Sequence, residues 1–488
     1  MRRILGIGLF SLAFAGAAAA QLDSIWARTY GGPSNDGFRS VAVTADGGFL
    51  AVGYTYSFGA GNTDLYAVRA DGNGDTLWTR TYGGAGRDYG WGCAPTADGG
   101  FAIAGYTTSR GSGKEDLWLV RIDSGGDTLW TRAYGGPRDD EGRAILETPE
   151  GDLMVVGWTD VGANELDLWI LRTESDGDTL WTRRYGGTGV DVGYAIARTA
   201  DGFYAAVGWD GEDGGYQQAL LVKVDDDGYE VCSEIYGNDH PVNYEWAMDV
   251  CALEDSGVVM SVTRGVEGSD PADAGYVQTF GDCSQRRYRA NTGVYYEYGN
   301  GILRKWDGAF LVAGASKREN DHTNDLFLAE RSGGAGWIYN QAIGGAGTDW
   351  AQALERISPG RYVLAGHTNS EGAGGFDAWL VLVQEQSVSV EAGEPAARSA
   401  LLSAPRPNPA RSSLAFSIHM ARSGSVDLRV LNVAGKVVRR LHGGDLPPGT
   451  HTFEWDTRND RGRPVSSGVY FLAAEGAVHG MRKAIVLR

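Results

Sequence analysis

Cysteine, histidine and long apolar runs are scarce in this chain of 488 residues. The four cysteines form no C-x-x-C pair, and none of the seven histidines is paired at ligand spacing, so we expect no metal site. The 43 Lys and Arg are outnumbered by 62 Asp and Glu, a net charge of −19 that argues against nucleic acid or an anionic membrane surface as partner. No G-x-S-x-G, H-E-x-x-H or P-loop motif occurs, so no catalytic residue is predicted.

Glycine and aromatic residues, in contrast, are abundant. Gly accounts for 74 of the 488 residues, about twice the usual share of ~7%, and aromatic residues make up 11%. Disordered chains lack aromatic residues and collagen needs Gly at every third position, so both classes are excluded. The composition favours a turn-rich, all-β fold.

The first twenty residues form a separate element. Arg2 and Arg3 precede an apolar run at 4–17, and small residues end at Ala20, which is the layout of a secretory signal peptide over residues 1–20. A membrane anchor is the alternative, but the run is short and no stop signal follows it. We therefore expect a protein that is secreted or at the cell surface, with no membrane span in the mature chain from Gln21 onward.

Export permits disulfide bonds. The cysteines are Cys93, Cys232, Cys251 and Cys283. The last three lie within about fifty residues of one another, so a bridge among them is compatible with the sequence. Their pairing stays open.

A repeat of about 52 residues organises most of the chain. The motif W-x-R-x-Y-G-G, whose tryptophan we expect to pack between units, begins at Trp26, Trp78, Trp130 and Trp181, with spacings of 52, 52 and 51 residues. A second marker, D-G-G-F with a following apolar run, begins at Asp46 and Asp98 and recurs in weaker copies. A third marker is an Asp-led apolar run, at Asp64, Asp116, Asp167, Asp325 and Asp377. The markers agree on seven units.

Each unit fits four short strands, which in the first unit are expected at 41–44, 49–55, 65–69 and 76–82. Four-stranded units repeated every 40–50 residues are typical of a β-propeller. A linear solenoid is the alternative, but it would need a polar cap at each end. The last unit lacks its fourth strand, and an extra strand at 24–30 precedes the first unit and can supply it. We predict a seven-bladed β-propeller over 21–386, closed by this N-terminal strand.

The remainder of the chain has a different pattern. Residues 387–404 are rich in Ser, Glu, Ala and Pro and predict a linker. From Pro405 onward, P-R-P-N-P is followed by alternating strands, by P-G-T-H-T-F-E-W and S-G-V-Y-F, and by a basic, apolar end.

These two patterns resemble known families. The repeats resemble those of bacterial secreted β-propeller repeat proteins, over about three quarters of the chain, a likeness that names no ligand. The tail resembles the C-terminal sorting domain of the type IX secretion system and the similar Ig-like domain of flagellar-hook capping proteins. This implies an Ig-like β-sandwich over 405–488, read by an outer-membrane translocon for secretion or surface attachment; a plain structural module is the alternative. The expected fold is all-β, a seven-bladed β-propeller followed by a small Ig-like β-sandwich.

Candidate binding residues follow the Gly that ends the second strand of each unit. Because propeller blades are related by rotation, these residues should form a ring on one face, and they are Tyr54, Tyr106, Trp158, Trp209, Thr263, Ala315 and His367. The consecutive aromatic residues offer the broad apolar contact with a polar edge that sugars and peptides bind. The alternative is that these rings pack between blades. The irregular fifth unit, from Cys232 to Cys283, is a second candidate for the ligand site.

The aspartates of the repeat have a simpler expected role. Asp64 and Asp116 should cap turns by accepting local N–H groups rather than catalyse. The loops at 71–75 and 225–228 imitate part of a calcium site but lack the downstream Gly and Glu. Tight turns explain them, so no cofactor is expected, and calcium is the alternative.

We expect a non-catalytic binding or scaffold protein that recognises an extracellular polysaccharide or protein. A propeller enzyme acting on polysaccharide, a glycoside hydrolase or lyase with Asp or Glu as acid and base, is the rival. A structural surface-layer component is a third reading. An enzyme should carry carboxylates unique to one or two blades in the central cleft. This feature would distinguish an enzyme from a binding protein.

Overall fold

The structure is a computed structural model that describes residues 22–163, 165–212, 217–237, 243–266, 269–290, 296–305, 308–317, 323–331, 337–385, 401–402, 405–407, 410–420, 423–432, 436–476 and 480–487. Regular structure in these ranges consists of strands alone, so the prediction of an all-β fold is confirmed. Within the same ranges, no helix has the length and apolar character needed to cross a membrane. The chain divides into two compact units, Met1–Ser387 and Val388–Arg488. The predicted signal peptide at 1–20 and most of the predicted linker at 387–404 lie outside the described residues.

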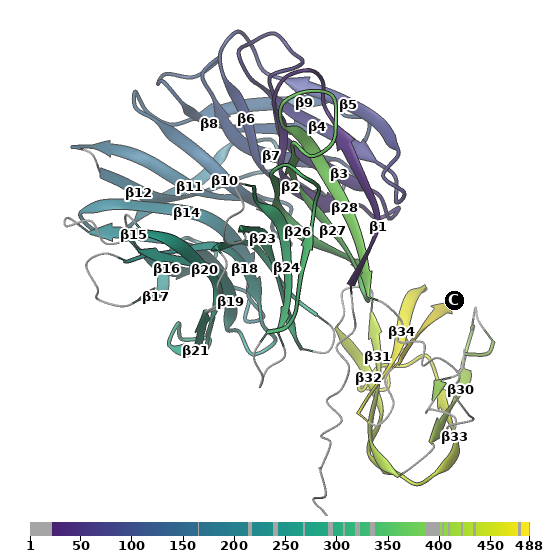
Figure 1. Ribbon diagram of the computed structural model, residues 1–488. Coiled ribbons are helices and arrows are strands. Elements are labelled where there is room, and N and C mark those ends of the chain that lie inside the picture. The colour runs from purple at the N-terminus through teal and green to yellow at the C-terminus, as the bar shows by residue number, and fades with distance from the viewer. Residues whose placement is uncertain are drawn as a thin grey trace, which may run out of the picture. The chain divides into compact units, whose positions relative to one another are not determined.

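The first unit repeats an antiparallel meander of four strands (Figure 1). The first two sheets are β2 (Asp36–Val43), β3 (Phe49–Thr55), β4 (Asp64–Ala70) and β5 (Thr76–Tyr82), then β6 (Asp88–Pro95), β7 (Phe101–Thr107), β8 (Asp116–Ile122) and β9 (Thr128–Tyr134). Three further meanders, joined only by single parallel bridges, are β10 (Asp140–Glu147), β11 (Leu153–Gly162), β12 (Glu165–Thr173) and β13 (Thr179–Tyr185); β14 (Gly189–Arg198), β15 (Tyr204–Glu212), β16 (Gln217–Val224) and β17 (Glu230–Tyr236); and β18 (Asn243–Ala252), β19 (Val258–Val266), β20 (Ser269–Thr279) and β21 (Gln285–Ala290). The next sheet is β22 (Tyr296–Arg304), β23 (Phe310–Lys317), β24 (Asp325–Arg331) and β25 (Trp337–Ile343).

The last sheet of this unit takes its outer strand from the other end of the chain. β26 (Asp349–Ser358), β27 (Arg361–Thr368) and β28 (Asp377–Glu385) form a meander, and β1 (Leu22–Tyr30) pairs antiparallel with β28. The register runs from Leu22 opposite Glu385 to Tyr30 opposite Ala378. β1 thus covers an edge of β28 that would otherwise present unpaired backbone groups.

Neighbouring sheets pack face to face around shared apolar cores. Leu50 of β3 shares a core with Trp118 of β8, and Phe49, on the opposite face of β3, shares another with Leu380 of β28. Successive residues of a strand face opposite sides, so this sheet is buried on both faces. Similar cores join the following sheets in chain order. Because the first and last sheets also pack on each other, the sheets surround a common centre in a propeller-like arrangement.

The W-x-R-x-Y motif fastens the four outer strands that carry it, β1, β5, β9 and β13, to the turn of the next sheet. Trp78 donates its Nε1–H to the carbonyl of Ser124 (3.1 Å), and the Tyr82 hydroxyl donates to the carbonyl of Gly126 (2.7 Å). Gly126 has a φ of 83°, and a Cβ there would lie 3.0 Å from the Trp78 ring. The equivalent tyrosine bonds are made by Tyr30, Tyr134 and Tyr185. The motif therefore packs between units, as predicted.

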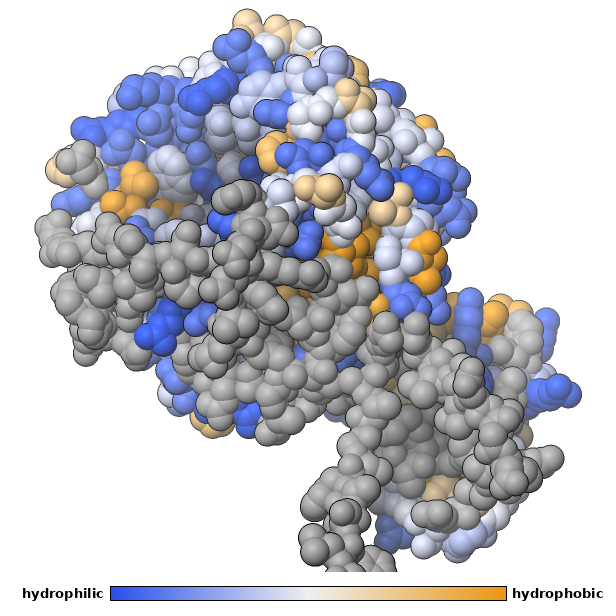
Figure 2. Space-filling view, viewed as in Figure 1, coloured by the Kyte–Doolittle hydropathy of each residue, from blue (hydrophilic) through white to orange (hydrophobic). Residues whose placement is uncertain are grey.

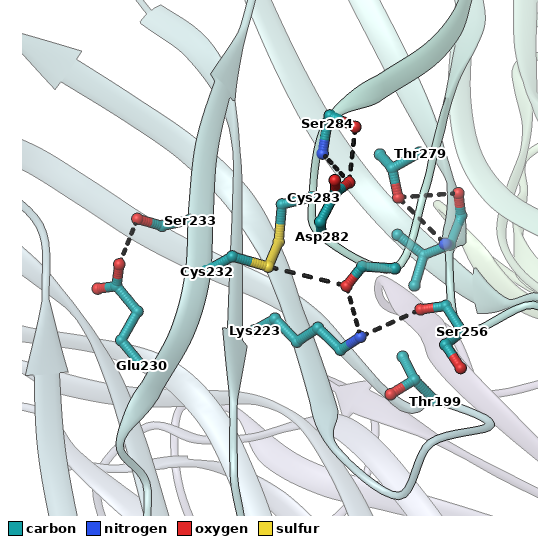
Figure 3. The surroundings of a disulfide bond; sticks show 12 residues. Thr199, Lys223, Glu230, Cys232, Ser233, Ser256, Thr279, Asp282, Cys283 and Ser284 are labelled. Carbon is teal, nitrogen blue, oxygen red and sulfur yellow. Dashed lines mark hydrogen bonds between the residues drawn. A yellow bond between two sulfur atoms is a disulfide. The ribbon is translucent and has the colours of Figure 1, made fainter.

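The structure settles the disulfide pairing that the sequence left open. Cys232 and Cys283 are bonded (Figure 3). Cys93 and Cys251 are free thiols. The bond joins β17 to the turn between β20 and β21, so it ties two neighbouring sheets together.

A buried lysine lies beside this bond (Figure 3). Lys223 is 3% exposed, and its Nζ donates to the Asp201 carboxylate at 2.8 Å. It also donates to the carbonyls of Gly281 (2.8 Å) and Ser256 (3.2 Å), which belong to the next sheet's turns. A buried cation with these partners reinforces the same junction.

The second unit contains two sheets. The three-stranded sheet is β29 (Leu401–Leu402), β30 (Leu414–Met420) and β33 (Gly449–Trp455), and the four-stranded sheet is β32 (Val437–Leu446), β31 (Gly424–Asn432), β34 (Gly468–Gly476) and β35 (Gly480–Val486). Trp455 of the first sheet and Leu428 and Leu472 of the second are fully buried in one core, which makes the unit a β-sandwich. Leu401 and Leu402 pair with β30 and so form β29. This strand lies inside the segment 387–404, which was expected to be a linker.

Hydrophilic side chains cover most of the described surface of the first unit that Figure 2 shows. Exposed apolar residues include Leu77, Leu129 and Leu180, which hold the same place in three outer strands. Exposed apolar residues are common on protein surfaces and do not by themselves mark a site.

Candidate functional site

The innermost strand of each sheet in the first unit carries one extra residue. The register of β2 against β3 shifts between Phe38 and Ser40, so that Arg39 has no residue opposite it. A β-bulge of this kind re-aims a side chain and is common next to functional sites. The same shift recurs in the other innermost strands, and the extra residues are Arg39, Trp91, Arg143, Tyr194, Met248, Asn300 and Gln352.

These seven residues line one pocket, which we call the central pocket. Its volume is about 200 Å³, and its wall is built from β2, β6, β10, β14, β18, β22 and β26. Larger hollows of about 440 and 500 Å³ each open between two neighbouring sheets instead. Because sites for drug-sized ligands are commonly ~300–1,000 Å³, the central pocket has room for one ring-sized group.

The central pocket is chemically one-sided. Four successive innermost strands supply Arg39, Trp91, Arg143 and Tyr194, and the other three supply the uncharged Met248, Asn300 and Gln352. The guanidinium carbon of Arg143 is 3.9 Å from the centroid of the Trp91 ring and 5.5 Å from that of Tyr194. That of Arg39 is 4.9 Å from the Trp91 centroid. Cation–π contacts, worth ~0.5–2 kcal/mol each, thus hold two cations at one wall.

The charges of these two arginines are compensated differently. Arg143 Nη2 lies 2.7 Å from Glu141 Oε2. Within the described ranges Arg39 forms no ion pair, and the Nε atoms of both arginines and Nε1 of Trp91 are buried without a hydrogen-bond partner. Burial lowers the pKa of Arg39, and the nearby charge of Arg143 lowers it further. Since an unsatisfied buried donor costs roughly 1–3 kcal/mol, this wall is suited to bind an acceptor.

A carboxyl pair lies next to Arg143. Glu141 is 6% exposed and hydrogen-bonds Glu115, which itself lies 2.6 Å from Arg87 Nη2. Burial raises the pKa of Glu141 to about 7; Arg143 opposes the shift and Glu115 strengthens it. With a pKa of about 7, Glu141 is partly protonated near neutral pH and neutralises Arg143 only in part.

Two further carboxyl groups line the central pocket further along the strands. Asp249 follows the extra residue of β18 by one position, and Glu355 follows that of β26 by three. Asp249 accepts the N–H groups of Ile302 and Val250, both at 2.8 Å. Burial raises the pKa of each acid to about 7, and Asp249 adds to the shift of Glu355. Glu355 is exposed where it borders the pocket, and no other innermost strand has an acid at either position.

The predicted binding residues surround the central pocket without lining it. Tyr54 and Tyr106 both stack on Tyr89, with ring centroids 4.9 and 5.2 Å apart. Tyr54 and Tyr106 are 8% and 7% exposed, and Arg39 lies over the Tyr54 ring at 5.3 Å. These rings therefore pack between strands, and the Tyr54 ring also contacts the guanidinium group of Arg39.

The other predicted residues take different places. Trp209 donates its Nε1–H to the Tyr194 hydroxyl at 3.4 Å, and Trp158 lies opposite Glu141 in the sheet register. Burial lowers the pKa of His367 to about 3, and Arg39 contributes to the shift, so this imidazole is neutral. The remaining two, Thr263 and Ala315, are buried.

Sequence reasoning missed the extra residues, although the repeat holds their signal. Each lies three positions after the acidic residue that opens or nearly opens an innermost strand, as in D-G-F-R, D-Y-G-W and D-E-G-R at 36–39, 88–91 and 140–143. An acidic residue is present at this place in every unit, whereas the residue three positions after it differs from unit to unit. Comparing the units for a variable position within a constant frame would have found them.

Three of the five repeated aspartates cap turns, as predicted, whereas Asp167 forms an ion pair with Arg184. Asp64 accepts the N–H of Gly61 at 3.0 Å, and comparable bonds are made by Asp116 and Asp377. In the loops at 71–75 and 225–228, Asp71 and Asp225 likewise accept backbone N–H groups of their own turns. Among the described residues, no group of three or more potential metal ligands is found.

The C-terminal unit matches a known family. Residues 410–479 match the family model described as FlgD Ig-like domain, which confirms the resemblance to the Ig-like domain of flagellar-hook capping proteins. A curated relative, the regulatory protein FlaEY of Caulobacter vibrioides, is 29% identical over 110 residues. That match covers 20% of this chain and 12% of the relative.

Solved structures similar to this chain include two proteins with low sequence identity. PorZ, described as a surface component of the type-IX secretion system of Porphyromonas gingivalis, is 13% identical with a TM-score of 0.41, covering 94% of this chain and 60% of PorZ. YCF48, solved with a D1 peptide, is 12% identical with a TM-score of 0.43, covering 77% of this chain and 100% of YCF48. With TM-scores below 0.5 these likenesses support no statement on function.

Proposed function

We propose that this chain is an exported binding protein of the cell surface or extracellular space, whose propeller recognises a polysaccharide or protein partner through the central pocket. The observation that carries the proposal is the ring of extra residues. In an otherwise regular repeat these positions vary, and successive strands place Arg39, Trp91 and Arg143 at one wall with buried, unpaired N–H groups. A local departure from a regular pattern marks a functional site more often than a structural one.

The rest of the proposal concerns architecture and location. Seven blades are supported by the four-stranded meanders of β2–β28, the last completed by β1. Export is supported by the layout of residues 1–20 and by the Cys232–Cys283 disulfide, because such bonds persist in oxidising compartments. For the Ig-like domain we propose type IX-like secretion or surface attachment, with the translocon as partner, on the motifs of 405–488.

A second candidate function rests on a separate observation. Asp249 and Glu355 both line the central pocket, are unique to their strands, and have a pKa of about 7. Carboxyl groups whose pKa lies near the working pH serve as general acids and bases, for instance in glycoside hydrolysis. An enzyme acting on polysaccharide is therefore the alternative to pure recognition.

One experiment separates these functions. The full mature chain is applied to a polysaccharide and glycan array, and bound protein and released sugar are read together. Binding without release is the expected result, and Trp91→Ala should abolish it, whereas Tyr229→Ala, on an outer turn, should not. If sugar is released and the Glu355→Gln variant no longer releases it, the enzyme is supported in place of the binding protein. Silence in both readouts, with self-association, would favour a structural surface layer.

A further inference from the structure

We infer that the central pocket selects an acidic sugar unit, with the ligand's carboxylate bound at the wall of Arg39, Trp91 and Arg143 and its hydroxyl groups facing the opposite wall. This inference rests on the proposed recognition function and adds the class of ligand. It follows from the distribution of charge and of hydrogen-bonding groups around the pocket.

The first step is the net charge of the wall. Arg39 forms no ion pair within the described ranges, and Arg143 is paired with Glu141, whose pKa is raised by burial. At this wall two guanidinium groups therefore have a single carboxyl partner, Glu141, whereas Asp249 and Glu355 lie across the pocket. In a chain of net charge −19 this is a local concentration of positive charge, and an anion is the ligand that would complete it.

The second step is that the fold does not require these cations. The equivalent positions of the next innermost strands carry Tyr194, Met248, Asn300 and Gln352, and the bulge and its register are the same there. A residue needed only to fill the centre or shape the strand could be any of these. The two arginines, on the strands before and after that of Trp91, are therefore not needed for the fold and point to a role in binding. The planar guanidinium group suits a carboxylate.

Hydrogen-bonding groups across the pocket suit the rest of the ligand. Opposite the cations the pocket presents the amides of Asn300 and Gln352 and the carboxyl groups of Asp249 and Glu355. Amides both donate and accept, and carboxylates accept, which matches the hydroxyl groups of a sugar. Two guanidinium groups lie within 5 Å of the Trp91 ring centroid, at 4.9 and 3.9 Å, so we assign its indole to positioning the cations and not to stacking on the sugar. The pocket has a volume of about 200 Å³, a cationic wall for one carboxylate and several groups that can bind hydroxyls. These features fit one uronic acid unit of a polymer.

The test compares charged and neutral forms of the same sugars. Oligomers of galacturonate, glucuronate and mannuronate, each with its methyl ester, are titrated calorimetrically into the full mature chain at pH 7.5. At least one acid should bind at least tenfold more tightly than its ester, and 0.5 M NaCl should weaken only the acid. Arg39→Gln should remove this tenfold preference and Arg39→Lys should keep part of it. Arg80→Gln, on an outer strand and also over a tryptophan ring, should change nothing.

Each other outcome overturns the inference in a recognisable way. Equal binding of acid and ester, unaffected by Arg39→Gln, would refute the acidic ligand and leave recognition standing. Arg39-dependent binding of a glutamate-rich peptide but of no uronate would refute the sugar class. Failure of every uronate, together with silence of the glycan array, would remove both the inference and the proposed recognition of polysaccharide. Circular dichroism melting of each variant checks that it is folded.

Discussion

The guanidinium carbon of Arg143 lies 3.9 Å from the centroid of the Trp91 ring, and the two side chains come from consecutive innermost strands. The guanidinium carbon of Arg39 lies 4.9 Å from the centroid of the same ring. Trp91 therefore attracts both cations, which offsets part of their mutual repulsion. The pocket can keep two cations together before any ligand arrives, so that a ligand need not order them.

Removing the ring should cost stability as well as binding. Trp91→Ala is expected to lower the free energy of unfolding by about 1–2 kcal/mol, since two cation–π contacts are lost and the guanidinium groups repel each other unshielded. Urea denaturation followed by circular dichroism measures this. Tyr229→Ala removes a comparable contact, Arg183 at 4.2 Å, from a surface residue that is 61% exposed and should cost less than about 0.5 kcal/mol. Equal costs for the two variants would contradict the role assigned to Trp91.

Asp249 should make stability depend on pH. Burial holds its pKa at about 7, above the ordinary value of 3.8, so between these values the folded state binds more protons than the unfolded state. The stability this group contributes is present at low pH and is lost as the pH rises to about 7. The difference in stability between Asp249→Asn and wild type should therefore shift in favour of the variant between pH 4 and 7 and be constant above pH 7, whatever fixed cost the loss of one accepted N–H group adds. Melting curves from pH 4 to 8 test this, and Asp71→Asn, on an exposed turn, should show no such gain.

How far the sequence predicts the fold is clear in the first meander. The expected strands at 49–55 and 76–82 coincide with β3 and β5, because a D-G turn precedes each strand and a Gly-Gly pair follows β5. The strand expected at 41–44 is in fact β2, Asp36–Val43. Its first half reads D-G-F-R, with a Gly and two charges, and the bulge at Arg39 breaks the alternation on which strand prediction depends.

The same bulge explains why the site was not found. A period of two assigns every residue to one face of a sheet, but an extra residue belongs to neither face, so Arg39 had no predicted surroundings. Tyr54 was chosen because it follows a constant Gly, and it lies behind the pocket, under the Arg39 guanidinium. Which strands meet around a centre, and what their extra residues face, depends on closure of the whole ring and is not a local property of sequence.

Glycines of the repeat allow strain and steric contact to be measured separately. Gly126→Ala should destabilise most, because its φ is 83° and the new Cβ would lie 3.0 Å from Trp78. Gly99→Ala, with φ of 87° but no atom within 4 Å of the new Cβ, should cost only the backbone strain, about 1–2 kcal/mol. Gly136→Ala has neither feature and should be close to neutral. If Gly126→Ala and Gly99→Ala lower the melting temperature equally, Trp78 does not press on the turn as the structure has it.

Closure of the ring by β1 can be tested by supplying that strand separately. Tyr30 is 8% exposed, shares a core with Phe49 and Leu380, and donates its hydroxyl to the carbonyl of Gly74 at 2.6 Å. A mature chain lacking residues 21–31 should therefore melt at a lower temperature, because the edge of β28 and this core become exposed. A synthetic peptide of residues 21–32 should restore the melting temperature by pairing with β28, as strand addition does elsewhere. The same peptide with Tyr30→Ala should restore less, since it loses both the hydrogen bond and the apolar contact. A shortened chain that melts like wild type and ignores both peptides would show that β1 is not what holds the first and last sheets together.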